Sequence, residues 1–145
     1  MDQATLEDRL RAFFEGEKRG ALAAYLFGSV ARGEARGDSD VDVALLLAAD
    51  PPATLSAPQF AVEAELERLL GRRVQVVVLN RASADLVHRV LRDGRLLLDR
   101  DPARRIRFEV QRRNEYFDMA PIRARYRRCL PAQPPATSAV ADRRR

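Results

Sequence analysis

Apolar side chains recur at helical spacing in the first stretch of the chain, residues 5–18. Because positions three and four apart lie on one face of a helix, this stretch predicts an amphipathic helix that ends near Gly20. Thr5 and Asp8 have the spacing of a capping box, so we expect this pair to cap the helix. The apolar positions are Leu6, Leu10, Phe13 and Phe14.

Farther along, apolar residues form short continuous runs of the length that buried strands have. Helical spacing returns between these runs, and we expect Gly71 and Gly94 to end the two helices concerned. Strands that alternate with helices predict an α/β (α+β) fold, a small mixed β-sheet backed by helices. The predicted strands are 21–27, 41–47, 74–79 and 96–98, and the predicted helices are 60–70 and 84–92.

The last third of the chain is more polar. Residues 104–128 have apolar side chains within a polar stretch, and Pro121 predicts two helical segments broken at the proline. From Pro131 onward the sequence lacks apolar periodicity and contains three prolines, which predicts a disordered basic tail over residues 131–145. We therefore expect one domain, residues 1–130, followed by this tail.

The composition is that of a soluble globular protein, because 46% of the 145 residues are hydrophobic and a chain of this length can bury a core. No apolar run approaches the length of a membrane span, and the opening MDQATLEDRL lacks the features of a leader. The single cysteine, Cys129, cannot form an internal disulfide. We therefore expect a cytoplasmic protein that does not contact a membrane.

The formal net charge of +5 is unevenly distributed. Thirteen arginines and five acidic residues lie from Arg100 to Arg145, which gives this segment a charge of +8 and leaves −3 for residues 1–99. A basic segment can contact nucleic acid or an acidic partner, or it can be a solvated arginine-rich face. These alternatives stay open here, although direct contact with nucleic acid is not the one we favour.

Candidate chemistry lies in the glycine-rich segment from Gly28 to Asp42, which joins the first two predicted strands. Gly28 lets the backbone turn sharply near a ligand, Ser29 adds a hydroxyl, and a short helix opening at Ser29 presents amides to an anion. Asp40 and Asp42 lie two positions apart, so both carboxylates project from one face of a strand. Such a like-charged pair is costly without a cation, which predicts a phosphate site beside a Mg²⁺ site.

Gly28-Ser29, ten further residues and Asp40-Val41-Asp42 together resemble the GS-x10-DxD signature of the polymerase β-like nucleotidyltransferases. Ala31-Arg32-Gly33 and the small size of the chain resemble the minimal nucleotidyltransferase (MNT) branch in particular. The resemblance implies an antitoxin that assembles with a HEPN ribonuclease toxin and transfers AMP from ATP, with Mg²⁺, to a tyrosine hydroxyl of that partner. It assigns the ATP phosphates to Gly28, Ser29 and Arg32, and the catalytic metal site to Asp40 and Asp42.

The chain departs from the resembled pattern at one position. In that family a third acid on the next strand completes the second metal site, and here the corresponding residue is Gln75. An amide oxygen can coordinate a hard cation but has no charge, so we expect Gln75 to be a weak metal ligand and transfer to be reduced.

Two other functions stay open. The chain could neutralise a HEPN toxin by binding alone, with the arginine-rich C-terminal segment as the contact surface. It could instead act on a small molecule, although enzymes of that kind generally have an additional helical domain for which this chain has little room. His88 lies within the apolar stripe of a predicted helix, where we expect packing rather than catalysis, and we expect the same of Tyr116 and Phe117.

Overall fold

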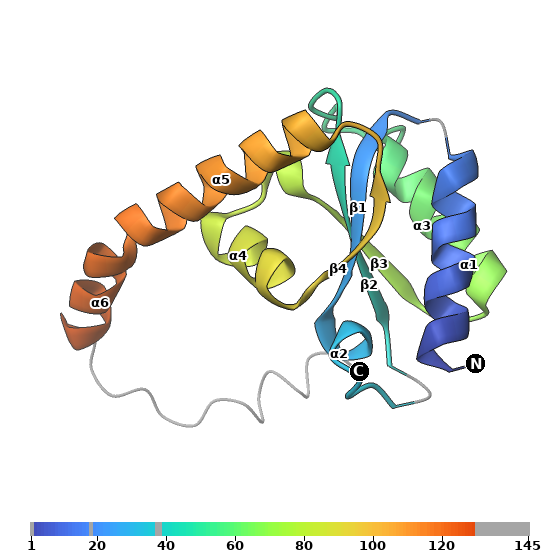
Figure 1. The fold of residues 1–145 in the computed structure, drawn as a ribbon, viewed down its shortest axis with the longest axis horizontal. Helices are drawn as coiled ribbons and strands as arrows, with labels where there is room; N and C mark the ends of the chain where they lie inside the picture. The colour runs from blue at the N-terminus through green and yellow to red at the C-terminus, as the bar shows by residue number, and fades with distance from the viewer. Residues whose placement is uncertain (1, 18, 37–38, 130–145) are drawn as a thin grey trace.

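The computed structural model of the chain describes residues 2–17, 19–36 and 39–129. Its fold is a four-stranded mixed sheet with helices on both faces, which confirms the predicted fold class (Figure 1). The predicted tail, 131–145, lies outside the described residues, and so does the side chain of Cys129. In chain order the elements are α1 (Gln3–Gly16), β1 (Ala21–Phe27), α2 (Gly28–Ala31), β2 (Val41–Leu47), α3 (Pro58–Leu70), β3 (Val74–Val78), the 3-10 turn Leu79–Arg81, α4 (Ala84–Asp93), β4 (Arg95–Asp99), α5 (Pro102–Asp118) and α6 (Ala120–Cys129).

The strands lie in the order β3-β2-β1-β4. Strand β1 is antiparallel to β2 and β4, whereas β2 and β3 are parallel. Parallel neighbours need a crossover, and α3 lies in the connection that supplies it. The sheet is therefore mixed, and the segment of candidate chemistry joins its two central strands.

Each face of the sheet has its own core because side chains alternate along the strands. On β2, Val43 and Leu45 pack with α1 and α3, whereas Ala44 and Leu46 pack on the other side with α4. Figure 1 shows these two layers, with α1 and α3 over one face and α4 and α5 over the other. The central strands are buried on both faces, which explains their continuous apolar sequences.

One expected helix cap is wrong, and the expected break into two C-terminal helices is present but lies two residues before Pro121. Helix α1 begins at Gln3 because Asp2 caps it: the Asp2 carboxylate accepts a hydrogen bond from the backbone N–H of Thr5 at 2.8 Å, so Thr5 and Asp8 do not form the cap. The break between the last helices falls at Met119, and Pro121 lies in the first turn of α6, where a missing N–H is tolerated. Gly71 and Gly94 follow the ends of α3 and α4 as predicted.

Helix α5 starts after β4 and runs past α4 away from the sheet, and α6 follows it (Figure 1). We call α5 and α6 together, residues 102–129, the arm, and its first half is held to the domain by side-chain contacts. The Tyr25 hydroxyl donates to Glu109 at 2.7 Å, and burial followed by this hydrogen bond raises the pKa of Tyr25 far above its ordinary value. Arg105 forms ion pairs with both Glu109 and Asp99, at 2.8 and 3.0 Å. Arg112 donates to two backbone carbonyls beyond β3. No residue of α5 is fully buried, so these polar contacts hold the helix together with two packing contacts, that of Phe108 on the core beneath α4 and that of Tyr116 on His88.

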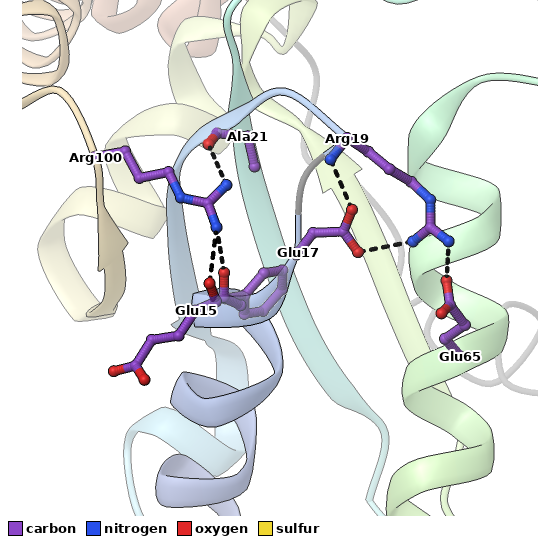
Figure 2. Close-up of polar contacts among 7 residues, drawn as sticks. Glu15, Glu17, Arg19, Ala21, Glu65 and Arg100 are labelled. Carbon is purple, nitrogen blue, oxygen red and sulfur yellow. Dashed lines mark hydrogen bonds and ion pairs between the residues drawn. The ribbon is translucent and has the colours of Figure 1, made fainter.

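Two arginines join the end of α1 to the rest of the domain (Figure 2). Arg19 forms ion pairs with Glu17 and with Glu65 of α3. Arg100, which follows β4, donates to the carbonyls of Phe14 and Glu15 at 2.8 and 3.2 Å. The last carbonyls of a helix have no N–H donor four residues ahead within it. The Phe14 carbonyl also accepts from the backbone N–H of Glu17 at 3.2 Å, so Arg100 adds a charge-assisted donor to one carbonyl that is already paired and to the carbonyl of Glu15.

Within the part of the chain that the structure describes, every helix is too short or too polar to cross a membrane.

We expect Arg100→Ala to lower the free energy of unfolding by about 1 kcal/mol, because it removes charge-assisted hydrogen bonds to the end of α1. The melting temperature should fall by roughly 3 °C for a domain of this size. Arg107→Ala is the matched control, since Arg107 is exposed and lies away from the contacts between Arg100 and the end of α1. Equal melting temperatures for the two variants would show that the Arg100 contacts contribute nothing to stability.

Candidate functional site

The turn after β1 lies directly against a carboxylate of β2. Antiparallel pairing sets Phe27 opposite Asp42, and the next residue, Gly28, has φ of +78°. A Cβ built on Gly28 would overlap Oδ2 of Asp42, so the carboxylate would have to move to admit a side chain. Glycine is favoured here by the positive φ, and any larger residue would also displace this carboxylate.

A hollow of about 320 Å³ opens beside this turn. Four residues singled out from the sequence line it together: Gly28, Ser29, Arg32 and Asp42. The short helix α2 places Ser29 at the mouth of the turn, as the sequence predicts. The hollow is thus a polar site built from the first two strands and the segment between them, with Phe27 as the apolar part of its lining.

Two further residues of the hollow, Arg89 and Asp93, come from α4. Sequence analysis missed both, because a charged residue on an amphipathic helix reads as part of its solvated face. They lie one turn apart, which places both side chains on the same side of α4. Only the packing of α4 against the sheet reveals that this side borders the hollow.

The carboxyl of Asp42 is influenced by burial and by two charged neighbours. Burial raises the pKa of the Asp42 carboxyl above its ordinary value, the charge of Asp40 raises it further, and the guanidinium of Arg32 acts in the opposite direction. Two carboxylates that repel each other beside a half-buried hollow are suited to a divalent cation, since hard cations prefer oxygen ligands. Asp42, with Asp40 close enough to raise its pKa, therefore offers carboxylate oxygens of the kind that Mg²⁺ prefers.

Gln75 lies beside Asp42, because the parallel pairing of β2 and β3 brings these two residues into register. Paired residues of parallel strands point to the same face, so Gln75 occupies the neighbouring position on the sheet. It lines a second hollow, of about 200 Å³, together with Asp40. The structure therefore places Asp40 and Gln75 together and Asp42 with the glycine turn, in two adjoining depressions.

Two glutamates of α3 that the sequence did not single out border this second hollow. The carboxylate of Glu67 accepts from the backbone N–H of Val74 at 3.1 Å, and that of Glu63 accepts from Val76 at 3.0 Å. Each glutamate side chain thus accepts a hydrogen bond from a backbone N–H on the edge of β3 that does not pair with β2. Among the described residues, no three His, Cys, Asp or Glu side chains form a group that could hold a metal ion.

The stack of His88 on Tyr116 is the packing contact expected from the sequence. Their rings are parallel, with centroids 3.8 Å apart, and they join α4 to α5. Phe117 meets both rings at their edges, but 61% of its surface is exposed. Phe117 is therefore only partly a packing residue, in contrast to what its position in an aromatic pair suggested.

Residues 9–103 match the family model for the polymerase β nucleotidyltransferases, which is about two-thirds of the chain. No curated protein sequence matches the chain significantly.

Solved structures share the fold. A toxin–antitoxin complex with AMP-PNP contains a chain with a TM-score of 0.70 and 24% identity, over 83% of this chain and 94% of that one. A complex of the tri-AMPylated Shewanella oneidensis HEPN toxin with an MNT antitoxin contains a chain with a TM-score of 0.66 and 22% identity, over 86% of this chain and 94% of that one. A candidate minimal nucleotidyltransferase is 38% identical, with a TM-score of 0.55, over 66% of this chain and 95% of its own.

We expect Gly28→Ala to destabilise the fold by more than 1 kcal/mol, because the new Cβ must displace the Asp42 carboxylate and alanine is strained at this φ. Gly16→Ala, at a position with open space, is the control. Chemical denaturation measures the free energy of unfolding of both variants. In an Asp42→Ala background the cost of Gly28→Ala should shrink, and an unchanged cost would show that the carboxylate does not oppose the Cβ.

Proposed function

Because this chain belongs to the polymerase β nucleotidyltransferase family and resembles its minimal members, we propose that it transfers AMP from ATP to a tyrosine hydroxyl of a HEPN-type toxin. The observation that carries this proposal is the turn at Gly28, which lies against Asp42. Ser29 and Arg32 line the same hollow. The relatives that share the fold support it, since one occurs in a complex with AMP-PNP and another in a complex with an AMPylated HEPN toxin.

In this proposal the chain's own residues bind and orient the nucleotide. Gly28 and Ser29 meet the triphosphate with backbone amides and a hydroxyl, and Arg32 lies beside them. Asp40 and Asp42 hold Mg²⁺, which when bound neutralises charge on the reacting phosphates. The reaction forms a bond between the acceptor oxygen and the α-phosphorus, breaks the bond to pyrophosphate and releases the acceptor proton.

The face of the arm that points away from the sheet is suited to the protein partner. Of the nine large hydrophobic side chains that are exposed among the described residues, five lie on α5 and α6 and a sixth, Met119, lies between these helices. A monomer rarely leaves such a stripe uncovered, so we infer that the toxin docks here. The arginines of this segment favour an acidic partner and disfavour the pairing of two like-charged arms. The six are Ile106, Val110, Phe117, Met119, Ile122 and Tyr126.

Two observations favour a second candidate function, in which the chain neutralises the toxin by binding alone. Gln75 brings no charge to the position beside Asp42, so the site has two carboxylates where the resembled family has three. The apolar face of the arm, by contrast, needs no chemistry in order to bind. The same structure can therefore support a slow transferase or an antitoxin that acts only through its surface.

Incubation with labelled ATP, Mg²⁺ and the product of the adjacent gene tests the proposal. We expect label on a tyrosine of the partner, and none with Asp40→Asn combined with Asp42→Asn, because the paired carboxylates are required for the metal. Circular dichroism checks that this double variant is folded, and calorimetry should show that it has lost Mg²⁺-dependent ATP binding. A partner that is neutralised without acquiring label would reject AMP transfer and establish binding alone.

We expect Gln75→Asp to increase the single-turnover rate of AMP transfer about tenfold, which corresponds to ~1.4 kcal/mol of transition-state stabilisation. The reason is that an added carboxylate beside Asp42 supplies the charge that a second metal ion requires. Gln75→Ala is the control and should reduce the rate. If the unaltered chain is as fast as the Asp variant and the Ala variant loses nothing, Gln75 is not a metal ligand.

A further inference from the structure

We propose that Arg89 is the principal cation that binds the phosphates of the nucleotide, an inference that rests on the nucleotidyl transfer proposed above. Arg89 lies on α4, outside the segment from Gly28 to Asp42 that carries the motif. It nevertheless lines the same hollow as Gly28, Ser29 and Asp42. The structure thus adds to the site a positive charge from a separate element.

The packing of α4 fixes the direction in which this arginine points. Val87 and Val90 are fully buried against the sheet, so the helix cannot rotate without exposing them. Arg89 and Asp93 follow one another by one turn and both border the hollow. Arg89 is exposed, which leaves its guanidinium accessible to a ligand that enters from solvent.

The other arginines near the hollow are already paired with carboxylates. Arg32 forms ion pairs with Glu34 at 2.9 Å and with Asp93 at 3.8 Å. Arg92 binds both carboxylate oxygens of Asp93, at 3.0 and 2.9 Å. Arg89 forms no hydrogen bond or ion pair with any residue that the structure describes. It is therefore the arginine of this hollow whose charge is not offset.

Such a charge has a specific use at this site. The two carboxylates that suit a metal ion also repel a polyphosphate, and the neighbouring Gln75 does nothing to bring in a second cation. A guanidinium can donate two parallel hydrogen bonds to phosphate oxygens, with an energy well above that of neutral hydrogen bonds. Arg89 can thus supply the positive charge that attracts the phosphates, in place of the second cation that a third carboxylate would have held.

The test compares ATP and AMP binding by titration calorimetry, in the presence of Mg²⁺, for the unaltered chain and for Arg89→Gln. We expect Arg89→Gln to weaken ATP binding about tenfold and AMP binding by less than about twofold, because AMP lacks the outer phosphates. Arg89→Lys should retain an intermediate ATP affinity, since it keeps the charge but not the planar fork. Arg107→Gln, the same change at another exposed arginine, should bind both nucleotides normally.

Two results would overturn the inference and leave the proposed function in place: ATP binding that Arg89→Gln does not change, or an equal loss for ATP and AMP, which would indicate a structural role. Failure of the unaltered chain to bind ATP would instead overturn both the inference and the proposed function. The behaviour of the unaltered chain thus separates the two failures.

Discussion

The register between β1 and β2 is the constraint on which the candidate site depends. It sets Phe27 opposite Asp42, and the chain then turns at Gly28 so closely that the carboxylate occupies the space of a Cβ. Side chains of a strand alternate between faces, so a slip of one residue would turn Asp42 into the core and bring a valine to the hollow. The apolar residues that fill both cores therefore also hold the polar site in place, because they leave the strands a single register.

Much of this arrangement could be predicted from the sequence, because the relevant signals are local. Four apolar runs and the glycines that end the helices follow from short-range sterics and periodicity. The expected common strand face of Asp40 and Asp42 is not seen, because β2 begins at Val41 and Asp40 lines the hollow of Gln75 rather than that of Asp42. The expected cap at Thr5 was wrong because Asp2, three residues earlier, competes for the same backbone donor.

The remainder depends on contacts between distant residues, which the sequence does not record. Nothing in residues 84–92 distinguishes Arg89 from an ordinary surface arginine until α4 is packed beside the turn. The position of Gln75 beside Asp42 was implied by the family resemblance and not by local periodicity, and the parallel pairing of β2 and β3 agrees with it. Phe117 was expected to be a packing residue, but it lies in the last turn of α5 and meets the rings of His88 and Tyr116 at their edges, and 61% of its surface stays exposed. The motif and the resemblance thus predicted the site residues of β2, β3 and the segment between the first two strands, whereas Arg89 and Asp93 of α4 were not predictable.

The glutamates of α3 have a consequence for the assembly of any complex. Strand β3 is an edge of the sheet, and the amides of Val74 and Val76 would ordinarily offer a template for a strand of another protein. Glu67 and Glu63 occupy these amides with carboxylate oxygens. An incoming strand would have to displace two charged acceptors and then bury them or return them to water. Growth of the sheet at β3 is therefore disfavoured, and a partner on that side must be recognised through side chains rather than by extending the β-ladder.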